Sequence, residues 1–137
     1  TPQRNVTGFN YKRLGMLIAV LEKRIGLVMG TKDIFINLVG GLTIDDPAAD
    51  LSVISAIASS TMDKYIEKNI ILCGEVGLTG EVRSINNLDR RIAEALSLGF
   101  KKAIVPSSSL KTKKLKNVNI DLIPVGNVKE AFKILFQ

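Results

Sequence analysis

The sequence has no histidine and no tryptophan, and it has a single cysteine, Cys73. One cysteine cannot close an internal disulfide, and without histidine or a second cysteine it cannot form a zinc site. Because Cys73 lies in an apolar run over residues 70–73, we interpret it as a core thiol in a reducing compartment, and we expect the protein to be cytoplasmic. The lack of histidine also removes the commonest partner of a catalytic nucleophile.

Long hydrophobic runs are also missing. No apolar run approaches the roughly 18 residues that a membrane span needs, and the first residues lack a signal-peptide pattern, so we expect no membrane partner. Aromatic residues are few, with two tyrosines and five phenylalanines, which disfavours binding through base stacking. The remaining composition, 46% hydrophobic and 23% charged over 137 residues, is typical of one α/β domain with its own core.

The net charge of +6 is unevenly distributed. Residues 1–80 hold eight Lys/Arg and eight Asp/Glu, whereas residues 81–137 hold eleven against five. Such an excess is typical of a surface that faces a polyanion. The alternative is a lysine-rich solvated face that keeps the domain soluble.

Helical and strand patterns alternate along the chain and predict a layered α/β domain over residues 10–137. Residues 1–9 are polar, with Pro2 and Gly8, and we interpret them as a linker or the end of an upstream segment. Helices are expected at residues 10–26, 47–60, 88–98 and 127–136. Asn10 is expected to cap the first of them and Gly99 to end the third, whose inward face is expected to hold Leu88, Ile92, Ala95 and Leu96. Strands are expected at residues 33–39, 70–74, 101–106 and 119–123, with a glycine-punctuated strand and turn at 74–83.

Residues 40–60 are the part of the sequence from which we predict the location of a site. An apolar strand reaches a loop with two glycines and two aspartates, and a helix of small and apolar residues follows. Asp46 is suited to cap this helix, and Pro47 to its first position, where the missing N–H would have no partner. The loop is therefore where we expect a site.

Two alternative sites carry little support from the residues. Gly30-Thr31-Lys32 has too short a glycine spacing for a phosphate loop and is better interpreted as a connector. A metal site or acid pair is conceivable among five carboxylates, but helix capping and solvated faces explain most of them. These residues are Asp45, Asp46, Asp50, Glu75 and Asp89.

Four segments together resemble the C-terminal Lon-protease-like domain of the bacterial RadA (Sms) family of DNA repair and recombination ATPases. They read Gly-Gly-Leu-Thr-Ile-Asp-Asp-Pro-Ala-Ala-Asp (40–50), Gly-Glu-Val-Gly-Leu-Thr-Gly-Glu-Val-Arg (74–83), Leu-Asp-Arg-Arg (88–91) and Gly-Phe-Lys-Lys-Ala-Ile-Val-Pro (99–106). The likeness extends in order over nearly the whole chain. It implies a Lon proteolytic-domain-like fold, of the ribosomal protein S5 domain 2-like type.

The resemblance also implies that this chain is one domain of a larger hexameric ATPase. A zinc-binding segment and a RecA-like core would lie elsewhere, because no Walker motif or cysteine cluster is present here. ATP, magnesium and zinc are accordingly expected in the missing domains, and no cofactor is expected in this fragment. The first strand of the Lon-like fold is expected upstream of Thr1.

The resemblance further indicates that the peptidase site is degenerate. Lon proteases carry a Ser-Lys dyad, in which a neutral lysine activates the serine. The serine position falls on Ala48 and the lysine position on Asp89, so neither chemical group is present. Other serines do not replace the nucleophile. Ser52, Ser55 and Ser59 lie one, two and three helical turns from the loop, at about 5 Å per turn, and Ser84 and Ser107–Ser109 have no evident base.

We therefore expect a non-catalytic domain that supports a homo-hexamer and binds the DNA backbone without sequence preference, in a branch-migration helicase of homologous recombination. Two alternatives stay open: an active Lon-type serine peptidase, and an oligomerisation scaffold without DNA contact. The candidate DNA-binding residues are Arg83, Arg90, Arg91, Lys101, Lys102, Lys111, Lys113, Lys114 and Lys116.

Overall fold

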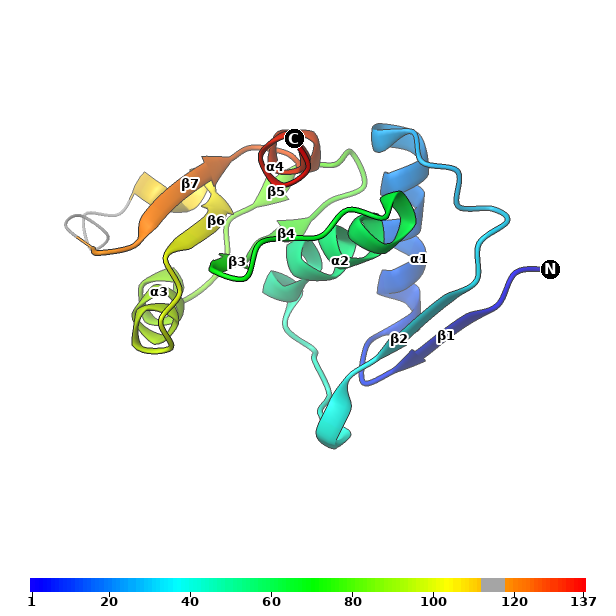
Figure 1. The fold of residues 1–137 in the computed structure, drawn as a ribbon, viewed down its shortest axis with the longest axis horizontal. Coiled ribbons are helices and arrows are strands. Elements are labelled where there is room, and N and C mark those ends of the chain that lie inside the picture. Colours follow the sequence, from blue (N-terminus) through cyan, green and yellow to red (C-terminus); the bar gives the residue numbers. More distant parts are fainter. Residues whose placement is uncertain (112–117) are drawn as a thin grey trace.

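A computed structural model describes residues 1–111 and 118–137 of the chain (Figure 1). Its elements follow in the order β1 (Arg4–Thr7), α1 (Tyr11–Val20), η1 (Leu21–Ile25), β2 (Ile34–Asn37), η2 (Val39–Gly41), η3 (Pro47–Ala49), α2 (Asp50–Met62), β3 (Ile70–Leu72), β4 (Glu75–Val76), β5 (Val82–Arg83), α3 (Leu88–Ser97), β6 (Lys102–Pro106), η4 (Ser107–Lys111), β7 (Asp121–Val125) and α4 (Val128–Leu135).

The described strands form three small sheets. β3, β6 and β7 make a parallel sheet in the order β3-β6-β7, β1 and β2 make a parallel pair, and β4 and β5 make an antiparallel hairpin. Parallel strands need helical crossovers, and α3 provides one on the way from β3 to β6. The α/β fold class expected from the sequence is therefore confirmed.

The larger core lies around α1 and α2, in the centre and on the right of Figure 1. Asn10 caps α1 through its side-chain oxygen, which accepts the Arg13 N–H at 3.0 Å, as its position before the helical pattern predicts. Leu14, Leu17 and Leu51 are almost fully buried between these helices and the strands. The first helical pattern ends at Gly26, whose φ of 86° suits glycine.

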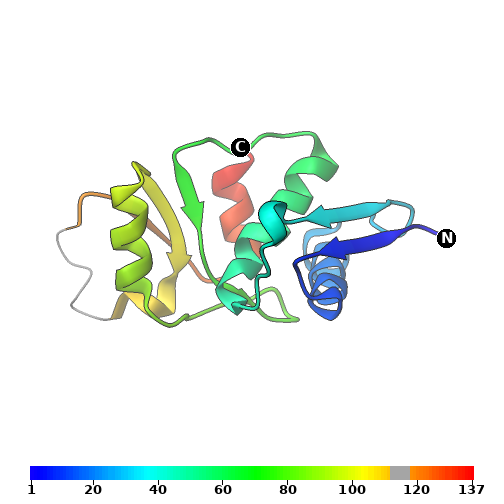
Figure 2. The same ribbon diagram turned by 90° about the horizontal axis from the view of Figure 1, so that it is seen from below.

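A second core lies between α3 and the parallel sheet, at the left end of Figure 1. Seen from below in Figure 2, α3 lies along this sheet, and α2 separates it from α1. Leu88, Ile92 and Ala95 form the buried face of α3. Gly99 follows the helix at a φ of 91°, in agreement with its expected role as the C-terminal cap.

Residues 1–9, interpreted from the sequence as a linker or the end of an upstream segment, contain a strand that the sequence did not predict. Residues 4–7 form strand β1, which pairs in parallel with β2, from Arg4 opposite Ile34 to Thr7 opposite Asn37. The Arg4 guanidinium also donates to the Met29 carbonyl at 2.8 Å. A four-residue strand with only one apolar side chain has little local signal, because its stability comes from a partner about thirty residues away.

Candidate functional site

The loop before α2 is built around Asp46. Its Oδ1 accepts the Ala48 N–H at 3.0 Å, and Pro47 occupies the first helical position, so the predicted cap is confirmed. The Ala48 N–H is the main cause of a lowered Asp46 pKa. Partial burial opposes this effect, and the Arg91 guanidinium reinforces it.

Asp50, four residues further on, is fully buried and has a structural role. Its carboxylate accepts two bonds from the Arg13 guanidinium, one of them at 2.9 Å from Nε, and a third from the Val76 N–H at 3.1 Å. The bond to Asp50 raises the pKa of Arg13. This charge pair joins α1, α2 and β4, and it leaves Asp50 no free oxygen facing a ligand.

The carboxylates considered for a metal site do not gather. Among the residues that the structure describes, no group of three or more His, Cys, Asp or Glu side chains could hold a metal ion. The single cysteine of the chain, Cys73, is buried, and burial raises its thiol pKa to about 11. A zinc site does not fit these residues.

A hollow of about 360 Å³ lies between the loop and the start of α3. It brings together Ala48, which is 3% exposed, and the segment where the dyad lysine is expected. Asp89 itself is exposed and is not part of the hollow's lining. The lining residues are Asp46, Pro47, Ala48, Glu75, Ser84, Ile85, Asn86, Asn87 and Arg91.

Arg91 is the one cation among the described residues of this lining. One guanidinium nitrogen donates to Asp46 Oδ2 at 2.6 Å, and Nε donates to the Asn86 carbonyl at 3.0 Å. A guanidinium stays protonated in proteins, so it cannot take a proton from a nucleophile. Among the described residues that line it, the hollow therefore has one hydroxyl, on Ser84, and neither an amine nor an imidazole to activate it.

The serines of α2 have other roles. Ser52 Oγ donates to the Leu72 carbonyl at 2.6 Å, and Ser59 Oγ donates to the Lys64 carbonyl. Ser55 is fully buried, and its hydroxyl has no hydrogen-bond partner in the described part of the chain. None of the three lines the hollow around Ala48.

Three of the candidate DNA-binding cations are paired with carboxylates. The Arg83 guanidinium lies 3.0 Å from Glu81 Oε2 and 3.9 Å from Glu75 Oε1. Lys102 Nζ lies 3.1 Å from Glu67 Oε1. Arg91 is the third, through Asp46. A bond from the Thr79 hydroxyl is the main cause that lowers the pKa of Glu81 to about 2, and Arg83 contributes. The partners of Arg91 and Lys102 are 45 and 35 positions away in the sequence, so sequence reasoning had no signal for those two pairs.

Arg90 and Lys101 are exposed and form no ion pair within residues 1–111 and 118–137. Arg90 lies in the first turn of α3. The nearby Ile85 N–H donates to Ser109 Oγ at 3.4 Å, so this end of α3 lies beside η4.

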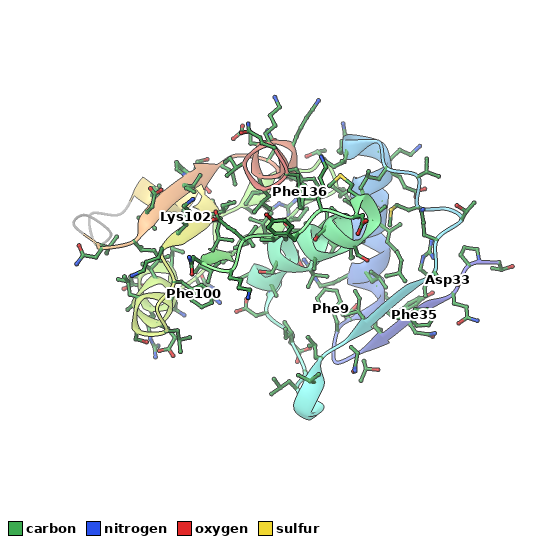
Figure 3. The ribbon with its side chains drawn as sticks, viewed as in Figure 1. Phe9, Asp33, Phe35, Phe100, Lys102 and Phe136 are labelled. Carbon is green, nitrogen blue, oxygen red and sulfur yellow. The ribbon has the colours of Figure 1, made fainter. Side chains whose placement is uncertain are left out.

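Lys101 lies after the carboxyl end of α3, directly before β6, and its backbone N–H donates to the Asn69 carbonyl at 2.9 Å. Figure 3 shows the neighbouring Phe100 and Lys102 at the α3 end of the molecule, opposite Asp33 and Phe35. Of the remaining candidates, Lys111 ends η4, and Lys113, Lys114 and Lys116 lie outside the described residues. In the described residues no helix is both long and apolar enough to cross a membrane.

Comparison with known proteins places these observations in a family. Residues 20–137 match the Lon protease (S16) C-terminal proteolytic domain. The chain is 40% identical over 136 residues to a DNA repair protein RadA of Aquifex aeolicus, covering 99% of the chain and 30% of that protein. For RadA of Bacillus subtilis the identity is 42% over 132 residues, covering 96% of the chain and 29% of that protein.

A third relative, RadA of Streptococcus pneumoniae, is 42% identical over 134 residues, with 98% of the chain and 32% of that protein covered. The chain thus spans about 30% of the length of these relatives. The resemblance to the Lon-like domain of RadA proteins is therefore confirmed over nearly the whole chain.

Proposed function

This chain belongs to the family of Lon protease (S16) C-terminal proteolytic domains, and from that premise we propose that it is a non-proteolytic member serving a DNA repair protein of the RadA type. The observation that carries the proposal is the hollow beside Ala48. It lies beside the residue to which the resemblance assigns the serine position, and the described residues of its lining include the Arg91–Asp46 ion pair but no pair of nucleophile and base.

The chemistry of acyl transfer supports the non-proteolytic interpretation. A serine peptidase of this type needs a hydroxyl within hydrogen-bond reach of a neutral amine. Ala48 has no hydroxyl, and Arg91 keeps its proton. Loss of either dyad member costs several orders of magnitude in rate. An active peptidase is thus the less favoured alternative.

For the positive role we propose binding to the DNA backbone within an ATP-driven branch-migration helicase assembled as a cytoplasmic homo-hexamer. Its ATP, magnesium and zinc would be bound outside this chain. The support is the name of the relatives, together with the excess of eleven Lys/Arg over five Asp/Glu in residues 81–137. A ring would present several copies of a weak contact, so that avidity strengthens it.

The ion pairs of the described residues change which of the predicted cations we expect to contact DNA. Arg83, Arg91 and Lys102 each have a carboxylate neighbour, which reduces the charge they offer to a phosphate. Among the described candidates, Arg90 and Lys101 are the better ones. The lysines at 111, 113, 114 and 116 stay in the proposal on the sequence alone. The same pairs favour the second candidate function, an oligomerisation scaffold without DNA contact.

Fluorescence anisotropy with a labelled duplex and a labelled single strand, at several salt concentrations, tests the DNA proposal. We expect saturable binding whose affinity falls steeply with salt, because phosphate contacts release counterions. Light scattering on the same samples reports the assembly state. A chain that assembles into hexamers but binds neither probe at low salt would support the scaffold instead.

A further inference from the structure

Four cations follow helix α4 along its length, and neither the sequence motifs nor the candidate site includes them. They are Arg24 on η1, Lys129 and Lys133 on α4, and Lys64 after α2. All four are exposed. Lys129 and Lys133 are four residues apart and thus lie on the same side of the helix. We call this set the α4 strip, and it extends along a helix about 12 Å long.

The two ends of the α4 strip are fixed by contacts. At the carboxyl end of α4, Lys64 Nζ donates to the Phe136 carbonyl at 3.3 Å, and Figure 3 shows Phe136 at that end. At the amino end, Arg24 and Lys129 line one hollow together with Gly80 and Asn127.

Arg24 is held in place by the turn after β4. A Cβ at Gly80 would lie only 3.3 Å from Arg24 Cγ, so the aliphatic stem of the arginine packs directly over this glycine. With its stem supported in this way, the guanidinium loses less conformational entropy when it binds an anion.

The cations of the α4 strip differ from several candidate DNA-binding residues predicted from the sequence in that they are not paired with carboxylates. None of its four members forms an ion pair with a carboxylate in the described part of the chain, whereas Arg83, Arg91 and Lys102 all do. Four carboxylates are close to the strip in sequence: Glu22, Asp63, Glu67 and Glu130. Glu67 pairs with Lys102 instead, at 3.1 Å. The oxygens of Glu130 accept bonds from the Gly126 N–H at 3.0 Å and the Asn127 side-chain amide at 3.2 Å, so they face the helix cap.

We propose that the α4 strip binds the phosphodiester backbone of a nucleic acid, as a contact additional to Arg90 and Lys101. The inference rests on the proposed function and names a further surface for it. Ammonium and guanidinium groups without carboxylate partners attract phosphates and release counterions on binding. Contacts of these cations to phosphates do not read base edges, so the recognition that we propose is independent of base sequence.

The test measures the salt dependence of duplex binding by fluorescence anisotropy for the 137-residue chain and two triple variants. The strip variant is Arg24→Gln with Lys129→Gln and Lys133→Gln. The matched control, with the same loss of net charge, is Lys12→Gln with Lys32→Gln and Lys68→Gln, at exposed positions that do not belong to the α4 strip. The double variant Lys129→Gln with Lys133→Gln keeps Arg24 in place, in case its stem is needed for folding.

Each phosphate contact contributes about 0.9 to the slope of log affinity against log salt concentration, so the strip variant should lose about 2.7 of this slope. Over a fourfold rise in salt, the unmodified chain should then lose about 40-fold more affinity than the strip variant. The double variant should lose about 1.8 of the slope, and the control should match the unmodified chain.

If both the strip variant and the control bind the duplex with the same slope of log affinity against log salt concentration, the α4 strip is not a DNA contact, and the proposed function stays intact. Absence of duplex binding by the unmodified chain at low salt would instead overturn the DNA proposal itself, and the strip with it. Circular dichroism of each variant shows that the compared proteins are folded.

Discussion

The buried charge pair beneath the loop gives the sharpest prediction on stability. Replacing Arg13 by methionine keeps most of the side-chain volume but leaves the Asp50 carboxylate, which is fully buried, without its cation. Removing one partner of a buried ion pair typically costs 3–5 kcal/mol. Because the Arg13 side chain is itself 31% exposed, water can reach the vacated space. We therefore expect a loss of about 3 kcal/mol.

Such a loss is a large part of the roughly 5–15 kcal/mol that stabilises a domain. Urea unfolding followed by circular dichroism measures it, since the chain has no tryptophan for a fluorescence signal. The control is Lys12→Met on the exposed start of α1, expected within about 0.5 kcal/mol of the unmodified chain.

A second substitution makes this prediction specific to the buried charge. Asp50→Asn should destabilise the unmodified chain, because it removes the charge that pairs with Arg13. In the Arg13→Met background the same change should raise stability, because it removes an unpaired buried carboxylate. An Arg13→Met loss below about 1 kcal/mol, or the same sign for Asp50→Asn in both backgrounds, would refute the reasoning.

Three further predictions concern single residues. The lowered pKa of Asp46 means that its carboxylate stabilises the fold fully above the unfolded value of about 3.9, and that this contribution is lost as pH falls through the folded pKa. Asp46→Asn keeps a capping side chain, so its stability, measured by urea unfolding across pH, should fall less steeply in acid than that of the unmodified chain. Gly8→Ala should destabilise the chain by about 2 kcal/mol in the same assay, since a Cβ there would collide with the Leu42 carbonyl at a φ of 85°; a neutral result would restore the linker interpretation of residues 1–9. Cys73, with a thiol pKa near 11 and little exposure, should react with a disulfide reagent at neutral pH at least tenfold more slowly in the folded chain than in urea, where free-thiol titration gives the reference rate.

Local patterns predicted the elements whose signals are confined to a few neighbouring residues. The amphipathic face of α3, the Asp46 cap and Gly99 depend on spacings of two to four residues, and all three are confirmed. Strand β1 was missed because its polar sequence becomes a strand only through pairing with β2. Periodicity cannot show such a partner.

The ion pairs around the candidate site could not be predicted from the sequence. The hollow around Ala48 lies where the family resemblance indicates, but the ion pair in it joins residues 45 positions apart. The Arg13–Asp50 pair likewise spans 37 positions. Both pairs depend on how helices pack, and one sequence without aligned relatives does not show which distant charges meet.

The lining of the hollow also indicates that restoring the two dyad side chains would not restore peptidase chemistry. A lysine acts as general base only when its surroundings lower its pKa, and neighbouring carboxylates have the opposite effect. Arg91 offsets the charge of Asp46 in the lining, but Glu75 also lines the hollow, and its nearest cation among the described residues, on Arg83, is 3.9 Å away and outside the lining. Asp89 lies outside the lining as well. We therefore expect the Ala48→Ser, Asp89→Lys variant to leave a casein-type substrate uncleaved under conditions in which an active Lon peptidase degrades it. Cleavage that depends on both substitutions would show that the site lacks only its dyad, and the electrostatic argument for a non-proteolytic domain would fail.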